Sequence, residues 1–159
     1  MRLEVHDAAA PPLRPFSRSL PMALLRAREA AMRKFRPSLH AHDLTEQQWR
    51  VLRALGSLEI VDATQLAALT FLLAPSLTRI LRDLEARKLI RRRSNPRDRR
   101  AALISLSGKG LDLIQTVGAE SERVYHEIEA HIGAQKLEHL MKLLAEVEAQ
   151  LGDGDPSGD

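Results

Sequence analysis

The chain has 159 residues, of which 44% are hydrophobic and 28% charged, so it can bury one core but is too short for an enzyme domain joined to a separate binding domain. It has no cysteine, which excludes disulfides, thiolate zinc sites, iron–sulfur clusters and thiol redox sensing. It has no apolar run of transmembrane length and no N-terminal signal peptide, and its 3% of aromatic residues leave Leu, Ala, Ile and Val to build the core, so we expect a cytoplasmic, mainly helical protein.

The formal net charge of +3 conceals two segments of opposite sign. From Arg79 to Arg100 the chain has ten basic and three acidic residues, a net charge of +7. From Leu111 to Asp159 it has three basic and eleven acidic residues, a net charge of −8. This division indicates that the basic segment faces a polyanion, whereas the acidic segment faces solvent or protein.

The N-terminal segment, residues 1–18, contains three prolines and no clear apolar periodicity, and is predicted to be a flexible arm. Ser19 can cap a helix that follows the arm. Pro37 lacks the amide that a helix needs, so this helix is expected to end or kink near Arg36. Its apolar side comprises Leu25, Met32, Phe35 and Leu39.

A capping box begins the second predicted helix, because the Thr45 hydroxyl and the Gln48 side chain can each satisfy the other's backbone amide. The helix is expected to end at Gly56, and a short extended piece follows over residues 59–62. The buried side of the helix comprises Trp49, Leu52 and Leu55.

Residues 63–70 and 74–88 are two helical stretches separated by a very short turn, which is the spacing of a helix-turn-helix. Pro75 lies in the first turn of the second stretch, so the residues around it stand near an exposed helix N-terminus, where this motif contacts base edges. The residues placed to do so are Ser76, Thr78, Arg79 and Arg82. The predicted shared core comprises Leu66, Leu69, Leu77, Ile80, Leu81 and Leu84.

The next segment is predicted to be a β-hairpin with a basic tip. Two short strand-like runs, residues 89–93 and 101–106, flank residues 94–100. The tip combines three arginines with the turn-forming residues Asn95, Pro96 and Asp98.

Ser107 caps a long helix that Gly133 breaks. The last helix has an apolar stripe too wide for one such unit to cover, so we expect a second copy of the chain to cover it in a homodimer. This stripe comprises Leu137, Leu140, Met141, Leu144, Val147 and Leu151. Residues 152–159 are predicted to be a disordered tail.

The order of these elements resembles the MarR family of bacterial regulators over about residues 20–150. The most specific stretches are residues 84–90, 95–100 and 104–110, which are similar to the family's recognition-helix end, wing and following helix start. The resemblance implies a mainly α fold with a small β-wing, in a single domain of residues 19–151. A winged helix-turn-helix core, about residues 45–106, would be flanked by dimerisation helices at about 19–40 and 107–151.

Within the family, the stretches at residues 30–32, 35–37, 44–50 and 75–78 look like the subgroup that regulates homoprotocatechuate (4-hydroxyphenylacetate) degradation operons. The resemblance therefore implies a repressor of an aromatic-acid catabolic operon; the alternative is a regulator of the same family that controls unrelated genes, with another small-molecule effector or none. Two positions depart from the usual family pattern, because Lys88 stands where glycine is common and Ser107 replaces threonine. Neither change threatens the fold, since serine caps a helix as threonine does.

DNA binding would divide between two kinds of contact. Arginines would neutralise phosphates, and some of them are expected to be only solvated charges; the candidates are Arg91, Arg92, Arg93, Arg97 and Arg99. Base edges in the major groove would meet Ser76, Thr78, Arg79 and Arg82, and Pro75 in the same first turn also belongs to the expected DNA-binding residues. The resemblance implies that Arg100 enters the minor groove, held by an ion pair with Asp98; the alternative is that Asp98 only makes the hairpin turn. A homodimer implies a pseudo-palindromic double-stranded operator with half-sites about one helical turn apart.

An effector site is expected around Arg28, which falls on the apolar stripe of the first helix and would need a partner such as a ligand carboxylate. The resemblance places a pocket between the first two helices and the long helix after the wing, which implicates Arg28, Met32, Arg36, His42, Trp49 and Arg50. Alternatively, Trp49 is plain core and Arg28 pairs with an acidic residue of the second subunit.

Three other function classes compete with this interpretation. The chain has no metal-ligand spacing, glycine-rich phosphate loop or nucleophile motif, so neither an enzyme, a metal site nor a cofactor is predicted, and its six histidines are scattered. A winged helix that binds protein is disfavoured by the basic wing. Equal binding to any DNA would favour an architectural role.

Overall fold

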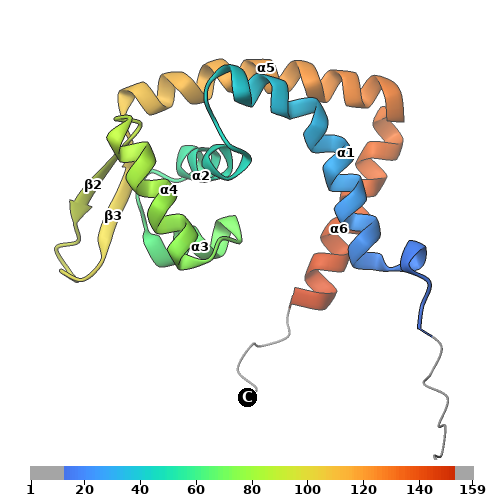
Figure 1. Cartoon of the computed structure of the whole chain (residues 1–159), viewed down its shortest axis with the longest axis horizontal. Coiled ribbons are helices and arrows are strands. Elements are labelled where there is room, and N and C mark those ends of the chain that lie inside the picture. Colours follow the sequence, from blue (N-terminus) through green and yellow to red (C-terminus); the bar gives the residue numbers. More distant parts are fainter. Residues whose placement is uncertain (1–12, 153–159) are drawn as a thin grey trace, which may run out of the picture. The chain divides into compact units, whose positions relative to one another are not determined.

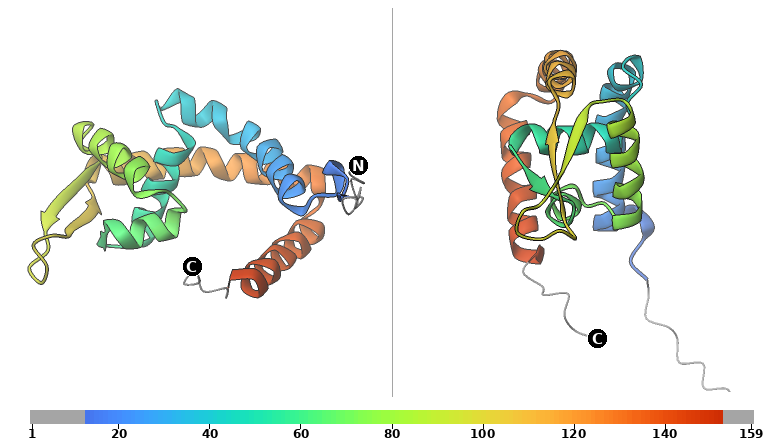
Figure 2. Two further views of the ribbon diagram at one scale, coloured as in Figure 1. Left: turned by 60° about the horizontal axis from the view of Figure 1, so that its bottom comes forward. Right: turned by 90° about the vertical axis from the view of Figure 1, so that its left-hand side faces the viewer.

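The computed structural model describes residues 13–152, which are mostly helical with a small antiparallel sheet (Figures 1 and 2). The elements in chain order are η1 (Phe16–Arg18), α1 (Leu20–Ala41), α2 (Glu46–Ser57), β1 (Val61–Asp62), α3 (Ala63–Thr70), α4 (Ala74–Ala86), β2 (Ile90–Ser94), β3 (Ala102–Leu106), α5 (Gly108–Ile132) and α6 (Ala134–Gly152). The chain packs as two compact units that divide within α1, after Lys34. The arm and tail predictions fall mostly on residues 1–12 and 153–159, outside the described residues. The described end of the arm contains the 3-10 turn η1.

Helix α1 begins as predicted but ends later than predicted. The Ser19 hydroxyl lies 3.5 Å from the amide of Met22, near the helix start. The prediction that Pro37 ends the helix near Arg36 is wrong, because α1 runs on to Ala41 with Pro37 inside it; a kink at this point stays a prediction. The turn after the proline is held by tertiary packing, since Leu39 is 1% exposed, and this packing offsets the missing backbone hydrogen bond.

Helix α2 forms the centre of the core. The predicted capping box is present, with Thr45 accepting from the amide of Gln48 and the Gln48 side chain accepting from the amide of Thr45. The helix ends at Ser57, one residue beyond the predicted stop. It contacts α3, α4, α5 and β3, and its buried face includes Trp49, Val51, Leu52 and Leu55.

Helices α3 and α4 form the predicted helix-turn-helix, and the chain bends by 108° between them. Five of the six predicted core residues are buried, but Leu69 is 56% exposed, so its assignment to the core is wrong. The eight-residue α3 points Leu66 and Thr70 inward, and at 3.6 residues per turn Leu69 lies roughly 80° away from their midline. Among the described residues no single helix is long and apolar enough to cross a membrane; α3 and α4 meet that test only together, as this bent pair.

The sheet has the strand order β1-β3-β2 with both pairings antiparallel. In its centre, Ile104 pairs with Val61 on one side and with Arg92 on the other. Strands β2 and β3 make the predicted hairpin, which projects away from the helices as a wing (Figure 2). Its base is buried through Ile90 and Ile104, which anchors it to the helical core.

The two last helices also follow the prediction. Ser107 caps α5 by accepting from the amide of Gly110, and Gly133 ends the helix with φ +93°. Helix α6 contains no buried residue, and most of its predicted apolar stripe is exposed, including Leu140, Met141, Leu144 and Leu151. In this single chain the stripe is therefore open.

Candidate nucleic-acid interface

The N-terminus of α4 differs from those of α2, α3 and α5. Those three helices have side-chain caps, provided by Thr45, Asp62 and Ser107. The corresponding residue of α4 is Leu73, which offers no capping group, and Pro75 follows in the first turn. The first backbone amides of α4 therefore lack a side-chain acceptor, and a helix N-terminus in this condition favours an anion such as a phosphate.

The predicted base-contacting side chains lie on the outer face of α4. Its inner face is anchored by Leu77, Ile80, Leu81 and Leu84. Thr78, Arg79 and Arg82 are exposed, and Ser76 is half-buried. The Thr78 hydroxyl donates to the carbonyl of Ala74 at 2.9 Å, which leaves its methyl group and both lone pairs of its oxygen for another partner.

Two side chains shape the tip of the wing. The Asn95 side chain accepts from the amide of Arg97, and the Asp98 carboxylate accepts from the amide of Arg100, both at 2.9 Å. The ion pair expected between the side chains of Asp98 and Arg100 is not among the ion pairs of residues 13–152. Asp98 makes the turn instead, because a carboxylate two residues before an amide is in position to accept from it locally.

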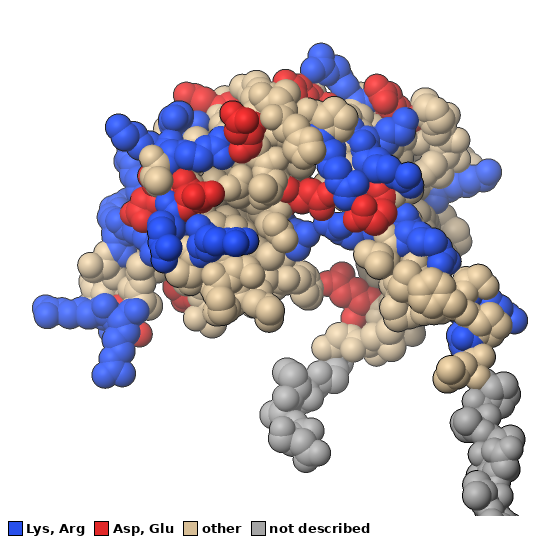
Figure 3. Space-filling view, in the orientation of Figure 1, with Lys and Arg blue, Asp and Glu red and all other residues tan. Residues whose placement is uncertain are grey.

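The arginines of the wing fall into two groups. Arg97, Arg99 and Arg100 at the tip are exposed, and Figure 3 shows basic side chains projecting from the end of the wing. In β2, the Arg92 guanidinium lies 3.3 Å from the carboxylate of Glu85 in α4, so part of its charge is compensated within the chain.

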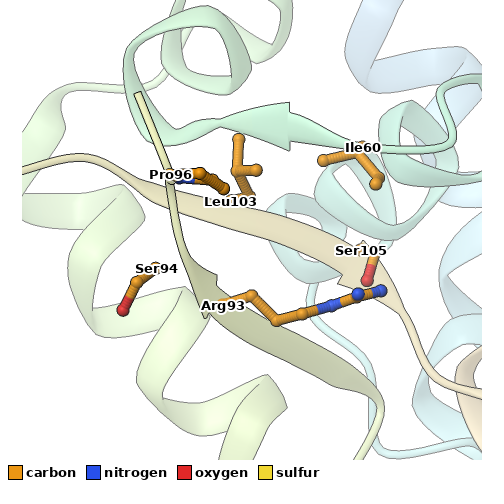
Figure 4. A pocket seen from close by; sticks show the side chains of 6 residues that line it. All are labelled: Ile60, Arg93, Ser94, Pro96, Leu103 and Ser105. Carbon is orange, nitrogen blue, oxygen red and sulfur yellow. The ribbon is translucent and has the colours of Figure 1, made fainter. Parts of the chain in front are cut away.

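Arg93 lies on the outer face of the sheet. It lines a shallow pocket of about 120 Å³ together with Ile60, Ser94, Pro96, Leu103 and Ser105. Figure 4 shows its side chain lying along the sheet with the guanidinium near Ser105. The stem of Arg93 therefore covers apolar surface at the base of the wing, and its charge stands at the edge of the sheet. Arg91, which pairs with Ser105 in the register, is exposed.

Among the predicted effector residues, Arg28 does not lie on a buried face. Its side chain is 42% exposed and pairs with the carboxylate of the adjacent Glu29 at 3.2 Å. Around Arg28 the apolar stripe of α1 is not buried, since Leu25 is exposed and Met32 is half-buried; burial begins further along the helix, at Leu39.

Three further predicted effector residues are bonded within the second unit. Arg36 pairs with Glu46 at 2.5 Å, and Arg50 donates to the carbonyl of Thr70 at 2.9 Å. His42 donates from Nε2 to Glu120 at 3.0 Å. Through these bonds the three side chains hold the ends of α1, α2 and α3 in place. Because the side chains are already bonded within the chain, they are less free to bind a ligand.

Two aromatic arrangements were not identified in the sequence. The guanidinium of Arg53 lies 5.9 Å from the centroid of the Trp49 ring, one helical turn earlier on α2. Phe35 and Tyr125 meet edge to face, with centroids 5.0 Å apart and planes at 61°. The spacing of Trp49 and Arg53, four residues apart on one helix, was a signal that could have paired them.

Glu120 is the acceptor of a small polar cluster. The hydrogen bond from the Ser38 hydroxyl, and next the one from His42, lower the pKa of the Glu120 carboxyl below its usual value of 4.5. Burial opposes this shift, while the charges of His42 and Arg123 add to it. Glu120 is therefore ionised at neutral pH and ties α5 to the end of α1.

Comparison with known proteins gives consistent matches. Residues 42–101 match the model of the MarR family. The chain is 43% identical over 128 residues to the homoprotocatechuate degradative operon repressor of Escherichia coli, covering 80% of this chain and 86% of that protein. A crystal structure of the transcriptional regulator PA4135 superposes with a TM-score of 0.81 at 41% identity, covering 86% and 98% of the two chains. The regulator NadR, in its crystal structure with 4-hydroxyphenylacetate, superposes with a TM-score of 0.77 at 38% identity, covering 85% and 98%.

Proposed function

Because the chain belongs to the MarR family of winged-helix transcription regulators, we propose that it represses an aromatic-acid catabolic operon by binding DNA as a homodimer, and that an aromatic carboxylate releases it. The observation that carries the proposal is the pairing of an uncapped α4 N-terminus with an arginine-tipped wing. An α-helix fits the major groove and reads base edges there, while arginines on a narrow hairpin suit phosphates or the minor groove.

The outer face of α4 provides the sequence readout. Thr78 and Arg79 stand close to the helix start, where they can meet base edges, and an arginine at such a position favours guanine. The tip arginines add salt-dependent affinity with little sequence information.

A homodimer follows from the open face of α6 and from the limited reach of one helix. Large apolar side chains on α6 are exposed in the single chain and would be covered by a second copy, among them Leu140, Met141, Leu143 and Leu144. Two copies related by a two-fold axis read two half-sites about 34 Å apart, so the operator is a pseudo-palindrome.

The effector proposal rests on the relatives and on the surroundings of Trp49. One relative represses homoprotocatechuate degradation and another has been crystallised with 4-hydroxyphenylacetate. The Trp49 side chain is 8% exposed, and the exposed guanidinium of Arg53, 5.9 Å from the centroid of the Trp49 ring, offers a partner for a carboxylate. Arg28 and Met32 remain proposed contacts, while Arg36, His42 and Arg50 would shape the site through the bonds they already make.

The test is fluorescence anisotropy with DNA from upstream of the chain's own gene and neighbouring genes, at one fixed salt concentration. We expect tight binding to one fragment, and release by 4-hydroxyphenylacetate or 3,4-dihydroxyphenylacetate but not by the neutral amide 4-hydroxyphenylacetamide. Arg53→Ala should keep DNA binding and lose the response to the acids, whereas Lys136→Ala, on the exposed surface of α6, should keep both.

The possible failures separate the two parts of the proposal. Tight binding that ignores both acids would refute the effector and keep the DNA-binding function. Equal affinity for every fragment and for scrambled DNA would refute the regulator itself and favour an architectural role.

A further inference from the structure

The turn between α3 and α4 exposes three large apolar side chains. Leu69 is 56% exposed, Phe71 84% and Leu73 78%. They stand immediately before the helix start that holds Ser76 and Thr78. Apolar side chains so exposed add nothing to the core, and clustered ones mark a surface that meets a partner.

Two of these positions hold residues that are locally unfavourable at a helix end. Phe71 has φ +52°, a left-handed conformation that costs a residue with a side chain roughly 1–2 kcal/mol and that glycine adopts freely. Leu73 occupies the N-cap of α4, where serine, threonine or aspartate would bond a free amide. Positions at which a sequence breaks such local rules without a gain in packing are expected at functional sites.

The turn and its flanking helical residues have a composition compatible with close approach to DNA. Residues 63–78 contain no charged side chain, so no carboxylate of this segment repels phosphates. At the C-terminal end of α3, Arg50 donates to the carbonyl of Thr70, which sets a positive charge against the negative end of that helix. The apolar turn thus directly precedes, in the chain, the helix whose outer face is proposed to enter the major groove.

We propose that Leu69, Phe71 and Leu73 form an apolar edge that packs against thymine methyl groups in each operator half-site. The C5 methyl group of thymine is the apolar feature of the major groove, and apolar side chains recognise it by contact. The inference rests on the proposed function and adds to it a base preference that hydrogen-bonding residues of α4 do not supply. The operator would have one or two essential thymines beside the base pairs that α4 reads.

The experiment removes the methyl group alone. In the operator identified by anisotropy, each thymine of both half-sites is replaced, one symmetric pair at a time, by deoxyuridine, which pairs with adenine as thymine does. One buried methyl group corresponds to a decrease in affinity of about fourfold per half-site. The wild type should show this decrease at one or two positions.

Variants of the turn then test whether its side chains cause the decrease in affinity for the deoxyuridine operator. Phe71→Gly relieves the left-handed conformation, so it should melt no lower than the wild type while binding the operator about tenfold more weakly. Leu73→Ser supplies the missing cap and should behave in the same way. Either variant should bind the deoxyuridine operator nearly as tightly as the thymine operator at the affected position.

Asp43→Gly is the matched control. Asp43 also has a left-handed backbone, with φ +53°, in the connection between α1 and α2. Its replacement removes a negative charge and no apolar surface, so this variant should keep full affinity and the full deoxyuridine effect.

Several outcomes would overturn the inference. It is wrong if no deoxyuridine position weakens wild-type binding, or if the deoxyuridine effect persists unchanged in both Phe71→Gly and Leu73→Ser. Normal DNA binding by Phe71→Gly with a change in its mass by analytical ultracentrifugation would assign the edge to a second copy of this chain. A wild type without preference for any fragment is a failure of the proposed function, and it is detected before any variant is made.

Discussion

His42 donates a hydrogen bond to Glu120 across 3.0 Å, and the hydroxyl of Ser38 donates to the other oxygen of the same carboxylate. Two elements far apart in the chain, the end of α1 and the middle of α5, are joined through this one acceptor. The contact also explains how α1 persists beyond Pro37, because Ser38 follows the proline directly.

The Glu120 carboxylate should stabilise the fold in a pH-dependent manner. Its pKa is lowered in the folded chain, so its contribution is fully present above the usual value of 4.5 and disappears as the pH falls through the lower folded value. Glu120→Gln should therefore lower the melting temperature at pH 7. In acid, the melting temperatures of the variant and the wild type should become equal. Thermal melts between pH 3 and pH 8 test this, with Glu122→Gln, exposed on the same helix, as the control. A constant difference at every pH would contradict it.

Replacing Lys88 with glycine should stabilise the fold. It has φ +60° just after α4, where a residue with a side chain is strained. Lys88→Gly should raise the free energy of unfolding by about 1 kcal/mol. Ala86→Gly, two residues earlier in the right-handed helix, should lower it by about the same amount. Urea unfolding gives the free energy of unfolding of both variants. A Lys88→Gly variant less stable than the wild type would refute the left-handed conformation of Lys88.

Ser107 should be replaceable only by threonine. Its hydroxyl accepts from the amide of Gly110 at 3.0 Å and donates to the carbonyl of Lys88 at 2.6 Å. Ser107→Ala should lower the free energy of unfolding by about 2 kcal/mol, since it removes both the helix cap and a second hydrogen bond in a nearly buried position. Ser107→Thr should remain within about 0.5 kcal/mol of the wild type if the hydroxyl is what counts. Equal destabilisation of the two variants would show that side-chain volume dominates.

The wing arginines should contribute unequally to the salt dependence of DNA binding. Replacing Arg97 or Arg99 with alanine should weaken binding to every sequence and reduce the slope of log K against log salt by about one for each phosphate that the arginine neutralises. Arg92→Ala should change the slope less, because Glu85 already compensates its charge. Salt titrations of the three variants on one operator test the ranking, and an equal effect of all three would refute it.

Much of the fold could be predicted because its boundaries are set by local chemistry. The capping box of Thr45 and Gln48, the Ser107 cap and the glycine that ends α5 each depend on residues within one turn. The basic hairpin was predictable for the same reason, since turn residues separate two short strand-like runs.

The errors came from contacts that sequence spacing does not encode. Pro37 should interrupt a helix by its own chemistry, but the burial of Leu39 outweighs that effect. Leu69 has helical spacing from other core residues, but α3 is oriented with Leu66 and Thr70 inward, which leaves Leu69 on the side of the helix. For Asp98 the sequence left two roles open, and in the structure its carboxylate accepts from the amide of Arg100 in the turn. At the effector site, the bonded states of Arg36 and Arg50 depend on partners in other elements, which no local pattern reveals.

The junction between the wing and α5 allows almost no relative movement. Ser107 bonds the carbonyl of Lys88, its amide bonds the carbonyl of Leu89, and Lys109 donates to the carbonyl of Arg87. A side chain at Gly110 would overlap the backbone of Leu89, so the two segments are in direct contact. With 25 residues, α5 is about 37 Å long, and a tilt of about 5° displaces one end by roughly 3 Å relative to the other. A rotation of α5 therefore carries the wing with it, and in the proposed homodimer the tilt of each α5 would set the position of its wing.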